Sequence, residues 1–225
     1  MTSLDGVQTP KTRQMPPNKT ALVAALDIGT SKIACLIARL KPCAPSDALR
    51  GRTHAVELIG LSHIQSRGVK AGAVVDLNEC EQAVRQAVAL AERMAKVRVE
   101  SVLLSVSAGR LQGAMVEASS ELRGGGVTPA DMSRVISAGM HHATPQGRTV
   151  LHVLPATYSL DGVKGVRDPS GMVARHFGID MNVMTADATA AKNLMLVVER
   201  CHLNVEAMAA GPYVSGLSVL TDDEA

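Results

Sequence analysis

The chain has 225 residues, a formal net charge of +2 and 46% hydrophobic residues, so it can form one or two domains with a real core. It contains no Trp, one Phe and two Tyr. Single-stranded nucleic acid is usually bound on stacked aromatic side chains, and a balanced charge gives no steering field for a polyanion. We therefore expect no nucleic-acid partner.

The cysteines and the apolar runs indicate a cytoplasmic protein. Cys35, Cys43, Cys80 and Cys201 are scattered without a C-x-x-C pair, which favours reduced thiols over a disulfide framework or a zinc site. The apolar run before Asp27 is too short for most signal peptides. No segment approaches the ~20 apolar residues that a membrane-spanning helix requires.

The first half of the chain predicts three strands and then a helix. Residues 1–20 are polar and rich in proline, which predicts a disordered tail. Apolar runs at 21–26, 33–40 and 55–63 predict strands, the first two joined as a hairpin, and 41–53 reads as a loop. A glycine-punctuated connector follows. It ends at Asp76 and Glu79, whose capping-box spacing predicts the start of a helix that runs to about Lys96.

The second half alternates between strands and helices. Residues 99–107, 113–122, 150–160, 179–185 and 205–209 predict strands, and 128–141, 188–201 and 212–220 predict helices. The triple glycine at 124–126 lacks the spacings of known phosphate loops and indicates a flexible turn. This order predicts an α/β layer with a mixed sheet, interrupted by a smaller α+β insert.

One stretch, "LDIGTSKIACLIA", suggests chemistry. A carboxylate, a glycine and two hydroxyls interrupt an apolar run, which is typical of a turn that holds a charged ligand. The simpler interpretation is a tight hairpin that needs Gly29 for its backbone angles. As a lone motif, D-x-G-T indicates a nucleotide site only weakly.

Together with the element order, this stretch resembles the first half of the actin/Hsp70/sugar-kinase ATPase superfamily, and within it the FtsA family of bacterial cell-division proteins. "SRGVKAGAVVDL", "VLHVLPATYSLDG", "DPSGM" and the last stretch, from "AKNLMLVVER" to the end, resemble further landmarks of that family. The similarity covers roughly residues 21–225. It implies an actin-like (ribonuclease H-like) α/β first lobe at 21–99 and 179–225, with a small SHS2-type α+β insert at 100–178.

The resemblance also implies a nucleotide site. Asp27 would hold Mg²⁺ through water, since Mg²⁺ keeps much of its hydration shell. The backbone N–H groups around Gly29, Thr30 and Ser31 would cradle the phosphates of ATP, and Lys32 would add a compact positive charge. One lobe supplies only half of such a site, so we expect weak ATP binding or none by this chain. We assign no catalytic residue; a weak ATPase activity is an expectation for the full-length protein only.

The FtsA family further implies an adaptor that links FtsZ filaments to the inner face of the cytoplasmic membrane at the septum. Its insert is implicated in self-association and in contacts with other division proteins. Its second lobe carries the FtsZ-binding region and is followed by an amphipathic membrane helix; we expect neither here. Two alternatives remain open. One is a truncated kinase or chaperone-type ATPase of the same superfamily, although a sugar kinase should lack the "SRG" segment and the insert. The other is a pilus-assembly protein with the same insert.

Overall fold

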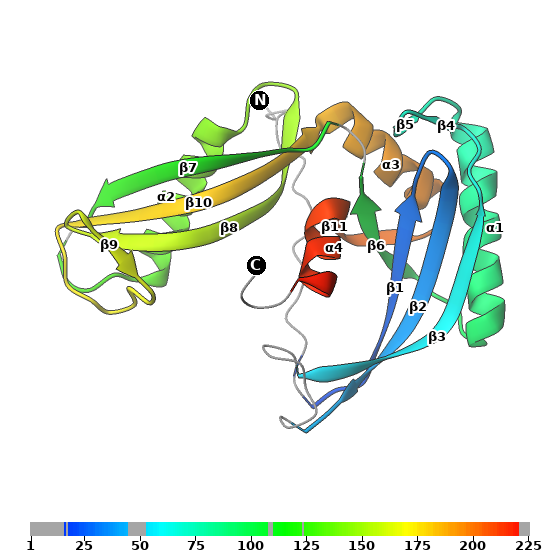
Figure 1. The fold of residues 1–225 in the computed structure, drawn as a ribbon, viewed down its shortest axis with the longest axis horizontal. Helices are drawn as coiled ribbons and strands as arrows, with labels where there is room; N and C mark the ends of the chain where they lie inside the picture. The colour runs from blue at the N-terminus through cyan, green and yellow to red at the C-terminus, as the bar shows by residue number, and fades with distance from the viewer. Residues whose placement is uncertain (1–15, 17, 45–52, 108–109, 123, 221–225) are drawn as a thin grey trace. The chain divides into compact units, whose positions relative to one another are not determined.

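The protein divides into two compact units in a computed structural model that describes residues 16, 18–44, 53–107, 110–122 and 124–220 (Figure 1). Unit 1 takes the chain up to Gly109 and again from Ala188, and unit 2 is the stretch Arg110–Asp187 between them. Most of the predicted tail at 1–20 lies outside the described residues, as does most of the loop at 41–53. No described helix is both long enough and apolar enough to cross a membrane.

Unit 1 is built on a five-stranded mixed sheet. Its spatial order is β11-β6-β1-β2-β3. β1 pairs antiparallel with β2, and β2 pairs antiparallel with β3, whereas β1, β6 and β11 run parallel. The strands are β1 (Ala21–Ile28), β2 (Lys32–Pro42), β3 (His54–Gln65), β6 (Ser101–Val106) and β11 (Asn204–Ala210).

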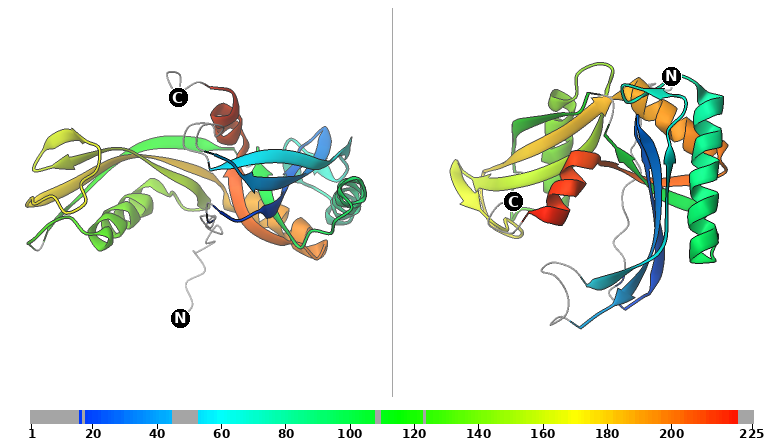
Figure 2. Two further views of the ribbon diagram at one scale, coloured as in Figure 1. Left: turned by 90° about the horizontal axis from the view of Figure 1, so that it is seen from below. Right: turned by 45° about the vertical axis from the view of Figure 1, so that its right-hand side comes forward.

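Helices lie on both faces of this sheet. α1 (Leu77–Ala95) and α3 (Ala188–Arg200) pack on one face, and α4 (Gly211–Val219) lies on the other (Figure 2). Contact between α1 and β3 is close at Gly60, where an added Cβ would lie 2.5 Å from a backbone oxygen of α1. Successive residues of a strand point to opposite faces of the sheet. Aliphatic side chains such as Leu26 and Leu104 are the ones that are buried, and they fill the core.

The start of α1 forms as its sequence predicts. The Asp76 side chain accepts hydrogen bonds from the N–H groups of Asn78 and Glu79, at 2.9 and 3.0 Å. On its exposed side, Glu81 pairs with Arg85 at 2.9 Å and with Arg200 of α3 at 2.7 Å. These two guanidinium groups hold the pKa of Glu81 below its usual range, chiefly through the hydrogen bond from Arg85.

The connector before α1 contains a small hairpin that the sequence patterns did not predict. It consists of β4 (Val69–Lys70) and β5 (Ala73–Val74), which pair only with each other. At its base, the carbonyl of Gly68 accepts from the N–H groups of Val75 and Asp76, at 2.8 and 3.1 Å. The hairpin is therefore joined directly to the residue that caps α1.

Unit 2 is a four-stranded antiparallel sheet covered on one face by a helix (Figure 1). Its order is β7-β10-β8-β9. Phe177 is completely buried, stacks on Tyr158 and packs with Ile179, Met181 and Val135. The elements are β7 (Gln112–Glu121), α2 (Pro129–Ala143), β8 (Arg148–Leu160), β9 (Val163–Val166) and β10 (His176–Asp187).

One arginine side chain links the beginning of unit 2 to its end by hydrogen bonds. Arg148 donates to the backbone carbonyl of Arg110, where unit 2 begins, at 2.7 Å. It also donates to the hydroxyl and the carbonyl of Thr185, near the end of the unit, at 2.8 and 2.9 Å. Its side chain thereby joins the first and last parts of the unit.

The expected boundaries of the insert at 100 and 178 are wrong. β6 pairs with β1 and β11 and so completes the sheet of unit 1. The strand expected at 179–185 is part of β10, which pairs with β7 and β8 inside unit 2. Both errors have the same cause: an apolar strand does not reveal from its own residues which sheet it joins. The insert therefore spans Arg110–Asp187.

Candidate nucleotide-binding site

The candidate site is the turn between β1 and β2. Ile28 and Ile33 form the last strand pair, and the N–H of Gly29 donates to the carbonyl of Lys32 at 3.0 Å. A Cβ at Gly29 would lie 3.0 Å from that same oxygen. The turn is the tight hairpin that the sequence predicted. Its glycine allows this close approach and does not serve a left-handed backbone conformation, since Gly29 is not among the residues with a positive φ.

Asp27 is partly buried on the face of β1 opposite to Leu26 and Ile28. It is in register with Ala34 on β2 and with Ser105 on β6, so these side chains point to the same face of the sheet. Among the described residues, no salt bridge involves Asp27. Its carboxylate is therefore available to a ligand from outside the chain.

The turn after Asp27 presents polar groups outward. Thr30, Ser31 and Lys32 are exposed. The N–H groups of Thr30 and Ser31 donate to no backbone carbonyl of the described residues, whereas the N–H of Gly29 is used within the hairpin. Of the three expected phosphate donors, the N–H groups of Thr30 and Ser31 thus have no backbone acceptor among the described residues, and that of Gly29 has one.

A second set of polar groups lies at the same edge of the sheet, and the sequence patterns did not reveal it. The carboxyl ends of β1, β6 and β11 meet there because these strands are parallel. α4 begins at Gly211, directly after β11, with no side-chain cap. A Cβ at Gly211 would overlap the Ser107 hydroxyl and lie 3.2 Å from that of Ser105. The edge therefore combines a carboxylate, hydroxyls and a helix N-terminus, which attracts anions.

The residues present fit a water-mediated magnesium ion better than a directly coordinated one. No group of three or more His, Cys, Asp or Glu side chains within the described ranges could hold a metal. Mg²⁺ is usually bound through one or two carboxylates, several waters and the phosphates of a substrate. Asp27 supplies such a single carboxylate beside the phosphate donors. The assignment of Mg²⁺ to Asp27 stays a prediction.

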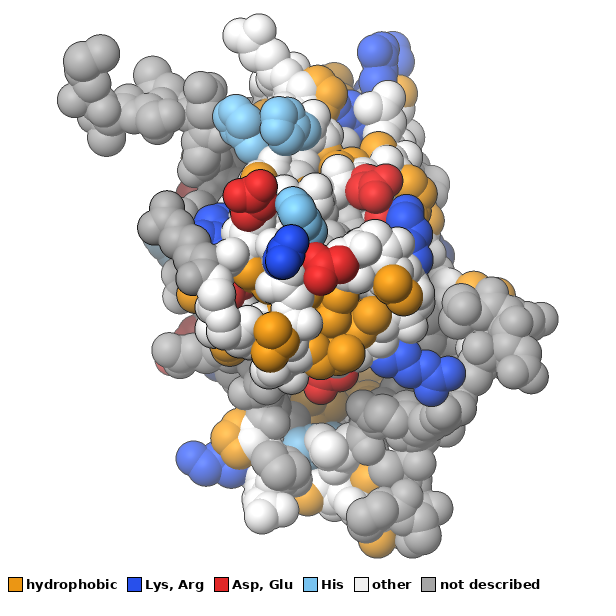
Figure 3. Space-filling view, turned by 90° about the vertical axis from the view of Figure 1, so that its left-hand side faces the viewer, with side chains coloured by type: hydrophobic (Ala, Val, Ile, Leu, Met, Phe, Trp, Pro, Cys, Tyr) orange, Lys and Arg blue, Asp and Glu red, His pale blue; other side chains and the backbone are white. Residues whose placement is uncertain are grey.

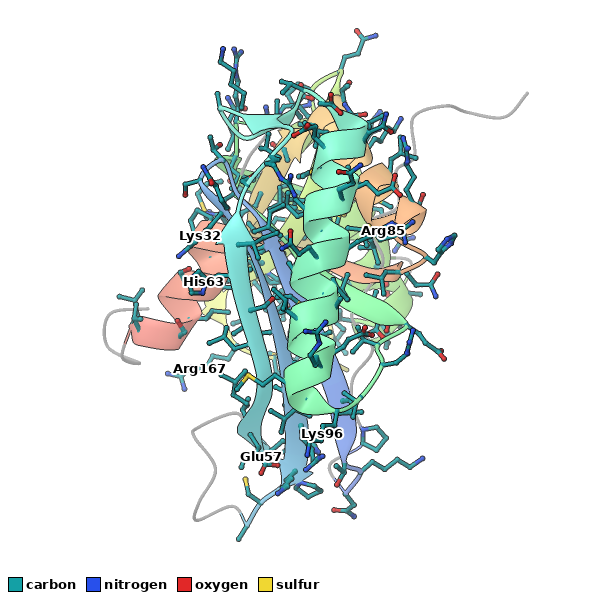
Figure 4. The ribbon with its side chains drawn as sticks, turned by 90° about the vertical axis from the view of Figure 1, so that its right-hand side faces the viewer. Lys32, Glu57, His63, Arg85, Lys96 and Arg167 are labelled. Atoms are coloured by element: carbon teal, nitrogen blue, oxygen red, sulfur yellow. The ribbon has the colours of Figure 1, made fainter. Side chains whose placement is uncertain are left out.

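One hollow of unit 1 lies away from the candidate site. A hollow of about 360 Å³ is lined by Glu92, Arg93, Lys96, Arg98 and two apolar neighbours, at the far end of α1. Lys32 and Lys96 lie toward opposite ends of unit 1 (Figure 4). This hollow is therefore not part of the candidate site.

The cysteines near the sheet are packing residues. Burial raises the pKa of the thiols of Cys35, Cys80 and Cys201 to about 11. Thiols with so high a pKa are poor nucleophiles at neutral pH, because the thiolate is the reactive form. They contribute no reactive group to the candidate site.

Comparison with known proteins decides the family. A family model described as the SHS2 domain inserted in FtsA matches residues 108–185. The cell division protein FtsA of Rhizobium meliloti (strain 1021) is 46% identical over 215 residues, which cover 96% of this chain and 49% of that protein. The chain belongs to the FtsA family. FtsA of Escherichia coli (strain K12) is 32% identical over 207 residues, covering 90% of this chain and 46% of that protein.

The FtsA match agrees with the observed division into units. The matched SHS2 residues 108–185 nearly coincide with unit 2, so the predicted fold class, an actin-like lobe with an SHS2-type insert, is confirmed. A solved PilM-PilN type IV pilus biogenesis complex has a similar fold, with a TM-score of 0.57, 12% identity, and coverage of 87% of this chain and 49% of that chain. At that identity the likeness concerns the fold alone. The chain spans about half the length of its FtsA relatives.

Proposed function

We propose that unit 1 contributes one side of a Mg-ATP site. The observation that carries the proposal is the carboxylate of Asp27 at the end of β1, which has no ion-pair partner among the described residues. It lies next to a turn whose Thr30 and Ser31 N–H groups donate to no backbone carbonyl of those same residues. Phosphate oxygens would accept from these N–H groups, and Lys32 would balance their charge. When bound, Mg²⁺ would neutralise phosphate charge and be held by Asp27 through water.

The same edge supports a phosphate at a second point. The N-terminus of α4 lies beside the hydroxyls of Ser105 and Ser107. An anion is stabilised there by the helix dipole and by hydroxyl donors. Ligand sites usually bury most of their ligand, and this chain spans about half the length of its relative. We propose that its affinity for ATP is weak.

In the cell, we propose an FtsA-type role: an ATP-binding adaptor that links FtsZ filaments to the cytoplasmic membrane at the division site, on its cytoplasmic side. The support is the 46% identity to a relative named as a cell division protein. FtsZ and the membrane would be contacted by parts of the FtsA family that this sequence does not match, since it covers 49% of that relative. A pilus-assembly role has only the shared fold in its favour.

Unit 2 is the proposed site of self-association and of contacts with other division proteins. Its surface carries exposed apolar side chains, among them Met115, Val163, Met172 and Val173, the last of which is 81% exposed. Figure 3 shows one face on which hydrophobic side chains gather beside charged ones. Exposed apolar patches often mark protein–protein contacts.

Calorimetric titration with Mg-ATP tests the nucleotide proposal. It is run on this chain and on the same chain extended by the second half of the Rhizobium meliloti relative. Each form is compared with Asp27→Asn and with Asp168→Asn, a matched acid-to-amide change in unit 2. We expect the extended chain to bind and its Asp27→Asn variant to bind about tenfold more weakly or not at all. Asp168→Asn should bind normally.

Two results would contradict the proposal. If the extended chain does not bind Mg-ATP, the assignment of a nucleotide to this site is refuted. Binding that is equally strong with Asp27→Asn shows that the ligand is held elsewhere. Tight binding by the short chain would refute only the view that unit 1 is half of the site.

A further inference from the structure

The hollow at the far end of α1 is lined mainly by cations. Arg93, Lys96 and Arg98 are exposed there, on the last turn of α1 and directly after it. None of the three forms an ion pair with another residue in the part of the chain that the structure describes. Three such cations around one hollow of about 360 Å³ create a positive potential that attracts an anion.

The lining of the hollow contains one acid, and that acid already has a partner. The carboxylate of Glu92 accepts a hydrogen bond from the N–H of Val99 at 2.8 Å. The backbone carbonyl of Glu92 accepts from the N–H groups of Lys96 and Val97. With three cations and one carboxylate, the lining keeps a formal charge of +2.

The end of the helix does not by itself explain these cations. A cation in the last turn is stabilised by the helix dipole, which accounts for Arg93, but that effect falls off beyond the last turn. Lys96 caps the helix with a φ of +56°, a left-handed conformation in which glycine is favoured and a side chain is strained. A lysine at this position therefore indicates a use for its charge other than folding.

Exposed apolar side chains lie next to the cations. Leu90 and Met94 are 38% and 61% exposed. Leu90 lies one helical turn from both Arg93 and Met94, so the cations and the apolar side chains share this end of α1. Anionic membranes are bound by surfaces of this kind, because the cations pair with headgroup phosphates while the apolar side chains enter the acyl boundary. A phosphate ion in solution would gain nothing from Leu90 and Met94.

We propose that this end of α1, which we call the basic end (Leu90, Arg93, Met94, Lys96 and Arg98), binds the phosphate headgroups of anionic lipids. The inference goes beyond the proposed adaptor role, since it gives unit 1 a membrane contact of its own. It does not depend on the candidate nucleotide site. Lys32 and Lys96 lie toward opposite ends of unit 1, so a membrane at the basic end would leave the turn after Asp27 uncovered (Figure 4).

Sedimentation with lipid vesicles tests the proposal on the full chain. One set of vesicles is phosphatidylcholine alone, and the other contains phosphatidylglycerol as well. We expect binding to the second set only. Each basic residue near an anionic surface adds about fivefold to the affinity, so the combined change Arg93→Gln, Lys96→Gln and Arg98→Gln should weaken binding about a hundredfold.

A matched control variant removes the same amount of charge elsewhere. It combines changes at three exposed cations that form no ion pair within the described ranges: Arg167→Gln, Arg175→Gln and Lys192→Gln. This variant should bind the anionic vesicles nearly as well as the wild type. The comparison separates a local site from an effect of net charge.

Two single changes distinguish lipid binding from other roles of the same residues. Lys96→Gly should raise the melting temperature, because it relieves the left-handed strain, and should weaken vesicle binding about fivefold. A purely structural role of Lys96 would not separate these two readouts. Met94→Gln should weaken vesicle binding as well, but should not change the binding of inorganic pyrophosphate measured by calorimetry.

The proposal is refuted if the wild type does not bind the anionic vesicles or binds both sets of vesicles equally. It is also refuted if the two triple variants lose the same affinity, or if Lys96→Gly binds the vesicles as strongly as the wild type. If pyrophosphate binds at the three cations and the vesicles do not, the hollow holds a soluble phosphate and the lipid assignment is wrong.

Discussion

Phe177 offers a direct test of whether the two units are stabilised separately. It is the only phenylalanine, is completely buried in the core of unit 2 and stacks on Tyr158 with ring centroids 6.0 Å apart. Replacing a buried phenylalanine by alanine typically costs about 3–5 kcal/mol, from lost burial and from the cavity that remains. A unit of this length has a total stability of roughly 4–12 kcal/mol. Phe177→Ala should therefore remove much of the stability of unit 2.

Residue-resolved hydrogen exchange on the variant shows which strands and helices lose protection of their backbone amides. We expect faster exchange throughout β7, β8 and β10, while β1, β2 and α1 keep their wild-type protection. Leu104→Ala, at a fully buried position in the sheet of unit 1, is the matched control and should give the opposite pattern. Equal loss of protection in both units with Phe177→Ala would refute the idea of two separate cores.

Two further changes test the packing of unit 1. Gly60→Ala should destabilise unit 1 by about 1–3 kcal/mol in urea unfolding, because its Cβ would meet the backbone of α1. Gly216→Ala in α4, whose Cβ would make only an ordinary contact with the Leu220 side chain at 3.6 Å, should stabilise the helix by up to about 1 kcal/mol. A loss of similar size in both variants would argue against the close contact at Gly60. The lowered pKa of Glu81 implies stability that is present above its unfolded pKa and lost as the pH falls through the folded value. The difference in melting temperature between wild type and Glu81→Gln should therefore shrink on acidification, and a difference that does not depend on pH would contradict the pairing with Arg85 and Arg200.

Local signals predicted the local structure well. The hairpin at Gly29 and the cap at Asp76 form as the residue types indicate, and α2 begins directly after Thr128, where the helix expected at 128–141 starts. Each depends on groups within a few residues of one another, so the sequence itself contains the information. The ends of these elements shifted by only one or two residues.

The missing information was long-range. β6 and β10 are apolar strands whose sheets are chosen by partners far away in the chain, and this is why both boundaries of the insert were wrong. At the candidate site, Asp27 and Thr30 were predicted from one motif, because they are neighbours in sequence. The hydroxyl of Ser107 beside Gly211, and the hydrogen bond from the Gly72 N–H to the Thr30 hydroxyl, arise only when separate segments fold together.

The arginine that joins the ends of unit 2 has an evolutionary consequence. Since Arg148 holds the backbone at Arg110 and at Thr185 together, the two points at which the chain enters and leaves this unit are neighbours. A segment with adjacent ends can be removed and its gap closed by a short linker, or grafted into another loop, without stretching either core. Recombination could have placed such a module in an ancestral ATPase-like lobe in a single step, and protein engineers can excise it in the same way.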